Sequence, residues 1–256
     1  MVPITEYRCN NLAQFLKHVA EEIDRQPNEK QATVLLWRGQ SRSEWRLWPN
    51  LQVMWQGRAD GLLEAEQKAF EDFSKAAPYL MPTSVSNDWD RLSVAQHYGM
   101  STRLLDWTVN PLLALWFSLS EPADCDGAVW ALRPQQVNML KDNARTRTSP
   151  FEIKNTRIFR PTMHSPRVAM QAGWHTVHRF DSTRGGLRAL DSMNVHRRCL
   201  AKFIIPRDKR TALFEQLEGM GVSVANAFGD LPSLCKHLST KYAAGVRADR
   251  SGVRGS

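Results

Sequence analysis

The spacing of apolar residues along the chain predicts four helices. Residues 11–25 place apolar side chains at helical intervals between charged ones, which is typical of an amphipathic helix. Residues 60–80 repeat the pattern over a longer stretch, and the helix is expected to end before Pro82. Two further helices are predicted towards the end of the sequence, over residues 208–218 and 231–242.

Short runs of β-branched and apolar residues predict strands between these helices. They cover residues 33–37, 127–132, 173–180, 199–206 and 222–225. Helices and strands follow one another without the strict alternation of βαβ units. This mixture favours an α+β fold over a doubly wound parallel sheet.

A polar cluster lies between two further helical patterns. The first pattern starts after Asn87, a predicted N-cap, and stops at Gly99, which is predicted to follow the helix end. The second pattern opens with Pro111, a residue suited to a first helical turn. Residues 96–108, QHYGMSTRLLDWT, hold an imidazole, two hydroxyls, a guanidinium and a carboxylate: His97, Ser101, Thr102, Arg103 and Asp106.

Two interpretations of this cluster stay open. Arg103 and Asp106 would form a structural ion pair, while Ser101 and Thr102 satisfy backbone groups of the turn. Alternatively, packing between two helices fixes the rotamers of a functional site.

Composition limits the class of protein. With 256 residues and 42% hydrophobic residues, the chain can build one sizeable core. The sequence has no apolar run of about 18 residues and no apolar segment typical of a secretory signal, so neither a membrane span nor secretion is expected. The four cysteines lie far apart, which favours reduced thiols in a cytoplasmic protein and predicts no metal site.

Positive charge suggests an anionic partner. The formal net charge is +8, and the sequence pI is about 9.6. Residues 141–170 concentrate the excess, so they are a candidate surface for nucleic acid or an acidic protein. A solvated basic face without a partner is the alternative.

Several common catalytic motifs are absent from the sequence. It contains no GxxxxGK[ST] loop, no GxGxxG after a predicted strand and no GxSxG elbow. No cluster of Asp and Glu stands at ligand spacing, which disfavours a metal-dependent nuclease. His175 and His178 fall on the alternating pattern of a predicted strand, where half-exposed sheet positions are expected.

Two motifs resemble the FRG domain, a family named for an aromatic–Arg–Gly start. Residues 37–51, beginning WRGQS, resemble its opening, and residues 96–108 with the following PLLALWF are similar to its most specific stretch. Weaker similarities follow at Arg167 with QAGW and at FGDLPSL. The resemblance predicts an N-terminal helix region over residues 1–30, an FRG domain over residues 31–242 and a flexible basic tail over residues 243–256.

The same layout is similar to that of mono-ADP-ribosyltransferases of the Arg–Ser/Thr–Glu type. This resemblance implies a single α+β domain with a mixed, mostly antiparallel central sheet flanked by helices, and NAD as the cofactor. A strand-terminal arginine would bind oxygens of the dinucleotide with paired donors, and the next glycine would let the ligand approach closely. The implied NAD-binding residues are Arg38, Gly39, Gln40, His97, Ser101, Thr102 and Arg167. The implied catalytic residues are Arg38, Thr102, Arg103, Asp106 and Gln171.

The chain departs from that pattern at the third motif. Gln171 stands where a glutamate is expected, and an amide has no charge to offset an oxocarbenium-like ribose. Asp106 or Asp230 would then supply the carboxylate from another position, although Asp230 also suits a helix N-cap. Otherwise the pocket binds a nucleotide without transferring it.

The sequence therefore leaves two classes of function open. One is a cytoplasmic ADP-ribosyltransferase-like enzyme, a toxin or phage-defence effector that acts on nucleic acid or protein. The other is a non-enzymatic module of a defence or toxin–antitoxin system. Such a module would bind a nucleotide, nucleic acid through residues 141–170, or an antitoxin or other partner protein. In either case we expect Arg38 and residues 101–106 to meet in one cleft.

Overall fold

The largest sheet combines strands from distant parts of the chain in the order β1-β9-β4-β2. The computed structural model describes residues 1–55, 61–80, 85–121, 123–162 and 173–223, together with residues 235, 238 and 239. The strands of this sheet are β1 (Thr5–Arg8), β2 (Leu36–Gln40), β4 (Gly127–Leu132) and β9 (Leu200–Ile205). Only β1 and β9 run parallel, while β9–β4 and β4–β2 are antiparallel.

A second sheet has the order β3-β6-β5, and both of its ladders are antiparallel. Its strands are β3 (Leu104–Trp107), β5 (Arg157–Phe159) and β6 (Trp174–Val177), and a short hairpin follows with β7 (Phe180–Asp181) and β8 (Gly186–Leu187). The two larger sheets meet at one bridge, where the backbones of Trp37 and Thr108 exchange hydrogen bonds of 2.7 and 2.8 Å.

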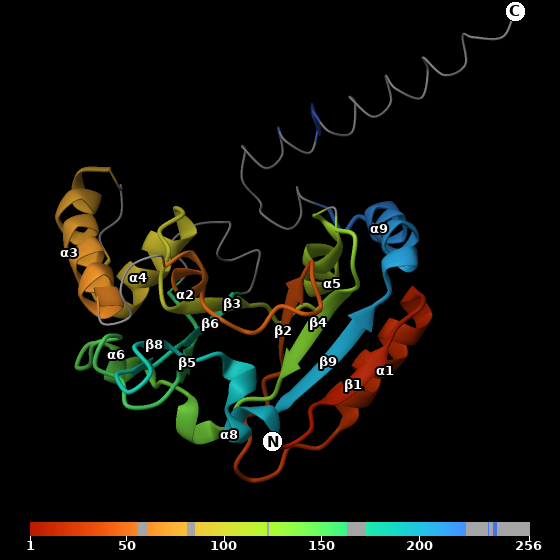
Figure 1. Cartoon of the computed structure of the whole chain (residues 1–256), viewed down its shortest axis with the longest axis horizontal. Helices are drawn as coiled ribbons and strands as arrows, with labels where there is room; N and C mark the ends of the chain where they lie inside the picture. Colours follow the sequence, from red (N-terminus) through yellow and green to blue (C-terminus); the bar gives the residue numbers. More distant parts are fainter. Residues whose placement is uncertain are drawn as a thin grey trace, which may run out of the picture.

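Helices cover the outer faces of both sheets (Figure 1). On the first sheet, α1 (Leu12–Asp24), α5 (Pro111–Leu119) and α9 (Arg210–Gly219) pack on one face. On the second sheet, α4 (Asp88–His97) and the neighbouring α3 (Leu62–Leu80) enclose a smaller core with β3, β5 and β6. The remaining short helices are α2 (Asn50–Met54), α6 (Asp142–Arg145) and α8 (Asn194–Arg197), with 3-10 turns at Gln136–Asn138, Leu190–Ser192 and Arg207–Lys209.

Alternation along β4 shows how the layers meet. Val129 and Ala131 belong to the core beneath the helices, whereas Ala128, Trp130 and Leu132 belong to a core shared with the second sheet. Every residue of β4 is buried, because one face packs on helices and the other on the second sheet. The fold is therefore a four-layer arrangement of helices, sheet, sheet and helices.

The α+β class and the mixed, mostly antiparallel pairing are confirmed, but the expectation of one central sheet is wrong. After Trp107 the chain makes a single pair with β2 and then enters α5 at Pro111. The strand β3 therefore pairs along its length with β6 instead, and the sheet is divided.

The predicted helix boundaries that flank the polar cluster are confirmed. Asn87 accepts a hydrogen bond from the backbone N–H of Asp90 at 2.9 Å and so caps α4. Gly99 follows the helix with φ of 98°, a conformation that favours glycine. Asn110 caps α5, with Pro111 in its first turn.

The strand predictions succeed in part. Residues 127–132 form β4 and residues 200–205 form β9, as expected. The strand predicted over residues 33–37 instead covers residues 36–40, because its pairing with β4 carries Arg38 and Gly39 inside the strand. The strand predicted over residues 173–180 is divided, with β6 ending at Val177 and β7 starting at Phe180.

Several predictions towards the end of the sequence fall largely outside the described residues. Val222 and Ser223 are not in a strand, and residues 224–225 are not described. Of the helix predicted over residues 231–242, the structure describes residues 235, 238 and 239 as helical. The tail predicted over residues 243–256 lies outside the described residues. No helix in the described ranges is long and apolar enough to cross a membrane.

Candidate functional site

A cavity of about 400 Å³ lies where the two larger sheets meet. Its size falls within the range of roughly 300–1,000 Å³ that is typical of small-molecule sites. The walls come from β2, β3 and the start of β6, with α4 and α5 beside them. Its polar lining includes Arg38, Gln40, Ser41, Ser93, Gln96, His97, Asp106, Glu121 and His175, and its aromatic lining includes Trp45, Trp107, Phe117 and Trp174.

The strand β2 places Arg38 in this cavity. Its Nη1 donates a 2.8 Å hydrogen bond to the backbone carbonyl of Asp106, which ties the first sheet to the second. Its Nε is buried and has no hydrogen-bond partner within the described ranges. Burial lowers the pKa of Arg38, and the nearby Asp106 carboxylate opposes that shift. The guanidinium is thus fixed at one end and has donor capacity left for a ligand.

Asp106 and His175 face each other across the β3–β6 ladder, where they are paired in register. The Nδ1 atom of His175 is 3.0 Å from the Oδ1 atom of Asp106. On its other side, His175 Nε2 lies 2.7 Å from the Ser93 hydroxyl of α4. Three side chains from three elements therefore form a continuous polar chain along the cavity wall.

Gln96 holds the same carboxylate from α4. Its amide N–H donates to Asp106 Oδ1, and its carbonyl accepts a hydrogen bond from the Thr102 hydroxyl. Ser93 and Gln96 are three residues apart, so they lie on one face of the helix. The contacts of the Asp106 carboxylate with Gln96 and His175 both reach Oδ1, which leaves Oδ2 available to a ligand.

The Asp106 carboxylate is surrounded by protein but reached by solvent through the cavity, and its side chain is 62% exposed. Burial acts to raise the pKa of Asp106, but the contacts with His175, Arg38 and Gln96 outweigh that effect and lower it. The carboxylate is therefore an anion at neutral pH and can attract a positive charge in the cavity.

Arg103 lies elsewhere and does not pair with Asp106. Its side chain is fully buried, with Nε 2.8 Å and Nη2 2.5 Å from Oε2 of Glu66 on α3. A further N–H donates to the Pro150 carbonyl at 3.2 Å, and the guanidinium lies 4.8 Å from the centre of the Phe151 ring. The Arg103–Asp106 ion pair, one of the two interpretations left open, does not form, because Arg103 precedes β3 and its guanidinium binds Glu66 instead. Arg103 does not line the cavity.

The hydroxyl pair also stays outside the cavity lining. Thr102 is fully buried and bonds to Gln96, while its oxygen accepts from the backbone N–H of Leu104 at 3.1 Å. Ser101 accepts a 3.4 Å hydrogen bond from Asn50. Both residues precede β3 rather than forming part of it, so their hydroxyls support the turn and not the pocket.

Gly39 and Gln40 line the cavity, but both are engaged by the protein itself. A Cβ on Gly39 would overlap the carbonyl of Ala114, so this glycine permits the close packing of α5 on β2. The expected close approach is therefore made by a helix. Gln40 accepts a 2.8 Å hydrogen bond from the Trp130 indole and donates to the Arg46 carbonyl at 3.3 Å.

The structure thus brings together part of the predicted set. Arg38, Gly39, Gln40, His97 and Asp106 share the cavity, whereas Ser101, Thr102 and Arg103 do not line it. Arg167, Gln171 and Asp230 lie outside the described residues.

Two side chains of the polar chain, His175 and Ser93, were not predicted as site residues from the sequence. His175 was expected to be half-exposed, but it is only 8% exposed and faces Asp106. Ser93 is 6% exposed and carries no motif of its own. The available signal was its spacing of three residues from Gln96, within a helix already predicted to border the cluster.

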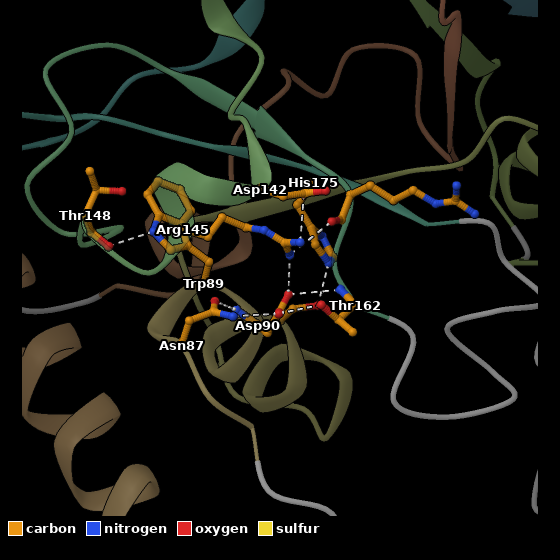
Figure 2. Close-up of polar contacts among 10 residues, drawn as sticks. Asn87, Trp89, Asp90, Asp142, Arg145, Thr148, Thr162 and His175 are labelled. Carbon is orange, nitrogen blue, oxygen red and sulfur yellow. Dashed lines mark hydrogen bonds and ion pairs between the residues drawn. The ribbon is translucent and has the colours of Figure 1, made fainter.

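The basic stretch is partly neutralised by a carboxylate distant in sequence. Arg145 donates at 2.8 Å both to Asp90 of α4 and to Asp142. Asp90 is 2% exposed and also accepts from the Thr162 backbone and hydroxyl and from the Asn87 amide (Figure 2). Burial acts to raise the pKa of Asp90, but these hydrogen bonds and Arg145 outweigh it. The result is a pKa below the usual range.

Comparison with protein-family models gives one result for the elements that carry this cavity. The FRG domain model matches residues 33–127. The matched residues include β2, α4, β3 and α5, and hence Arg38, Ser93, Gln96 and Asp106. His175 lies beyond it. The match supports the FRG resemblance of residues 37–51 and 96–108. The similarity to mono-ADP-ribosyltransferases stays a prediction. The search of curated proteins and the search of solved structures gave no match.

Proposed function

We propose that this protein is an ADP-ribosyltransferase-like enzyme that binds the nicotinamide end of NAD in the cavity between the two sheets. The observation that carries the proposal is the presence of Arg38 and an ionised Asp106 in one cavity, where Arg38 Nη1 donates a 2.8 Å hydrogen bond to the backbone carbonyl of Asp106. The role as a toxin or phage-defence effector rests on the family resemblance alone.

The cavity lining fits that end of the dinucleotide. Asp106 and Glu121 contribute two carboxylates, and Trp45, Phe117 and Trp174 contribute aromatic faces. Carboxylates and aromatic faces both attract a cationic ring, and the nicotinamide of NAD is one. The Arg38 guanidinium presents planar donors that match phosphate oxygens.

Asp106 takes the place that the expected glutamate leaves empty in the sequence pattern. Bound NAD would supply an ADP-ribosyl group whose bond to nicotinamide breaks. Asp106 Oδ2 would stabilise the positive charge that develops on the ribose, as carboxylates do in glycosidases. Gln96 and His175 hold Oδ1, so the carboxylate keeps one orientation.

The alternative of a nucleic-acid-binding module loses part of its support. Arg145 carries one of the charges counted in residues 141–170, but Asp90 and Asp142 already neutralise it. Lys141, Arg147, Lys154 and Arg160 remain exposed. In the enzyme we propose, these residues would contact an acidic acceptor.

NAD binding by calorimetry and nicotinamide release by chromatography test the proposal. We expect Arg38→Gln to weaken NAD binding about 10- to 100-fold, because a charge-assisted hydrogen bond is lost. Asp106→Asn should weaken NAD binding less than Arg38→Gln, because Glu121 and the aromatic walls remain, and should lower nicotinamide release by about 10²-fold or more. Arg8→Gln is the matched control, since Arg8 is an exposed arginine paired with Asp126 and does not line the cavity. Wild-type protein that binds no NAD at millimolar concentrations would overturn the proposal.

A further inference from the structure

We propose that Ser93, His175 and Asp106 form a nucleophile–base–carboxylate triad that gives the cavity an ester-cleaving activity separate from any NAD chemistry. The substrate class is a small neutral ester with an aromatic or apolar group. This inference needs no NAD and does not depend on the proposed function.

Distances and placement support the triad. The Ser93 hydroxyl is 2.7 Å from His175 Nε2, and His175 Nδ1 is 3.0 Å from Asp106 Oδ1. Hydroxyl-to-base distances of about 2.6–3.2 Å, with the base oriented by a third group, identify an activated nucleophile. All three residues line the same cavity. The arrangement therefore meets the geometric requirement where a substrate can enter.

The chemistry of the three groups sets the direction of the protons. Ionised Asp106 has no proton to donate, so the His175 nitrogen that faces it, Nδ1, carries the hydrogen. In the neutral imidazole, Nε2 would then hold a lone pair to which the Ser93 hydroxyl would donate. This is the direction in which a histidine can remove a proton from a serine.

The contact between His175 Nδ1 and Asp106 Oδ1 would become a well-aligned hydrogen bond when a substrate binds. His175 Nδ1 is buried and makes no hydrogen bond of good geometry within the described ranges, although Asp106 Oδ1 is 3.0 Å away. Catalytic hydrogen bonds are often poorly aligned in free enzymes and tighten in the complex. Asp106 and His175 both line the cavity, so a bound substrate lies beside this contact.

The surrounding fold holds the base in place. His175 is fixed opposite Asp106 by the β3–β6 register, and its ring lies 5.4 Å from that of Phe159. Ser93 is in the middle of α4, and Gln96 of the same helix bonds to Asp106. One helix face thus positions both ends of the triad.

The reaction balances with groups that the cavity supplies. Ser93 Oγ would attack the ester carbonyl carbon as its proton passes to His175 Nε2. The C–O bond of the ester would break, and the leaving alcohol would take that proton. Water would then release the acyl group from Ser93 by the same proton route. Arg38 would stabilise the negative charge on the carbonyl oxygen, and Asp106 would stabilise the imidazolium.

The aromatic walls indicate the type of ester. Trp45, Phe117 and Trp174 present apolar surface around the polar chain. Glu121 adds a second carboxylate to the lining, which disfavours an anionic ester. A neutral aryl ester suits both features, and 4-nitrophenyl butyrate is a convenient probe of this class.

The full-length chain should be treated with a fluorophosphonate reagent, which modifies activated serines, and the labelled peptide identified by mass spectrometry. We expect one adduct on Ser93, and hydrolysis of 4-nitrophenyl butyrate that falls at least 100-fold in Ser93→Ala. Asp106→Asn should slow both labelling and hydrolysis at least 10-fold. Because Asp106 is exposed, this variant should still fold. His175→Gln should abolish labelling.

Ser120→Ala is the matched control, because Ser120 lines the same cavity but donates to the Phe117 carbonyl at 3.2 Å. Its labelling and hydrolysis should equal those of the wild type. If wild-type protein is labelled no faster at Ser93 than the Asp106→Asn variant, Ser93 merely satisfies the buried imidazole and the proposal is overturned. Nicotinamide release is measured in a separate assay, so failure of one proposal does not imply failure of the other.

Discussion

Two pairs of residues have opposite environments, one just beyond the end of the β3–β6 ladder and one within it. On the core side, the His178 backbone N–H bonds to the Arg103 carbonyl at 3.1 Å, and both side chains are fully buried. On the cavity side, Asp106 faces His175 in register. Each pair joins a charged residue to a histidine, but the two differ in how far their polar groups are satisfied.

On the core side the partners come from the protein itself. Arg103 bonds to Glu66 and Pro150, and the two ring nitrogens of His178 lie 2.7 Å from the Arg188 carbonyl and 3.1 Å from the Thr176 hydroxyl. On the cavity side, Asp106 Oδ2 and the Nε of nearby Arg38 have no protein partner in the described part of the chain. Satisfied polar groups indicate a structural role, whereas open ones beside a cavity indicate a ligand.

The largest expected effect comes from removing the partner of Arg103. Glu66→Gln leaves a fully buried guanidinium without its counter-charge, and the free energy of unfolding should fall by about 3–5 kcal/mol. Urea denaturation measures this loss.

A double substitution is the control for that effect. Arg103→Met with Glu66→Leu removes both charges, and replacing a buried ion pair by apolar groups is often close to neutral. The double variant should therefore be more stable than Glu66→Gln alone. A double variant that is less stable than Glu66→Gln would show that the core-side pair itself stabilises the fold.

Acid should destabilise the protein through its buried histidines. Burial lowers the pKa of His178 and of His196 to about 4. The unfolded chain takes up protons near pH 6.5, so stability is full above that pH and is lost as the pH falls towards 4. Between pH 7 and pH 5 each histidine should cost about 2 kcal/mol of unfolding free energy.

His178→Gln isolates one of these contributions. Whatever its stability at pH 7, the variant should lose about 2 kcal/mol less than the wild type between pH 7 and pH 5. Chemical denaturation at both pH values measures the difference. An unchanged pH dependence would show that His178 is not held neutral by burial.

Substitutions at two glycines of the cavity lining compare a position packed against α5 with a position beside open space. A Cβ at position 39 would lie 2.6 Å from the Ser118 backbone nitrogen as well as overlapping Ala114. Gly39→Ala should therefore cost about 1–3 kcal/mol of stability. Gly173 also lines the cavity, but a Cβ there meets nothing within 4 Å. Gly173→Ala should leave the stability nearly unchanged. Thermal unfolding of both variants measures the difference.

The smallest effect on stability is expected on the cavity side. Asp106→Asn keeps the size of an exposed side chain, so the free energy of unfolding should change by less than about 1 kcal/mol. The same substitution should remove activity, which distinguishes it from Glu66→Gln. A loss as large as that of Glu66→Gln would remove the contrast between the two sides.

The sequence predicted local structure better than the site. Helix boundaries such as those at Asn87 and Pro111 depend on a few neighbouring residues, so their positions could be predicted directly. The roles of Arg103 and Asp106 could not, because they depend on which element each side chain contacts. That choice is fixed by partners distant in sequence, Glu66 on one side and His175 on the other. The sequence around Ser93 carries no functional motif, because its partner His175 lies 82 residues away and reaches it only through the position of β6.

The place of β9 in the first sheet has a consequence for how the chain reaches its native state. In the described part of the protein, β1 pairs only with β9, and β9 also pairs with β4. Nearly 200 residues separate Thr5 from its register partner Ala201, so this contact raises the contact order and slows folding. During synthesis, one edge of β4 and the whole of β1 remain unpaired until residues 200–205 have left the ribosome. Until then both expose unpaired backbone, and we expect this to be the stage at which the nascent chain is most prone to aggregate.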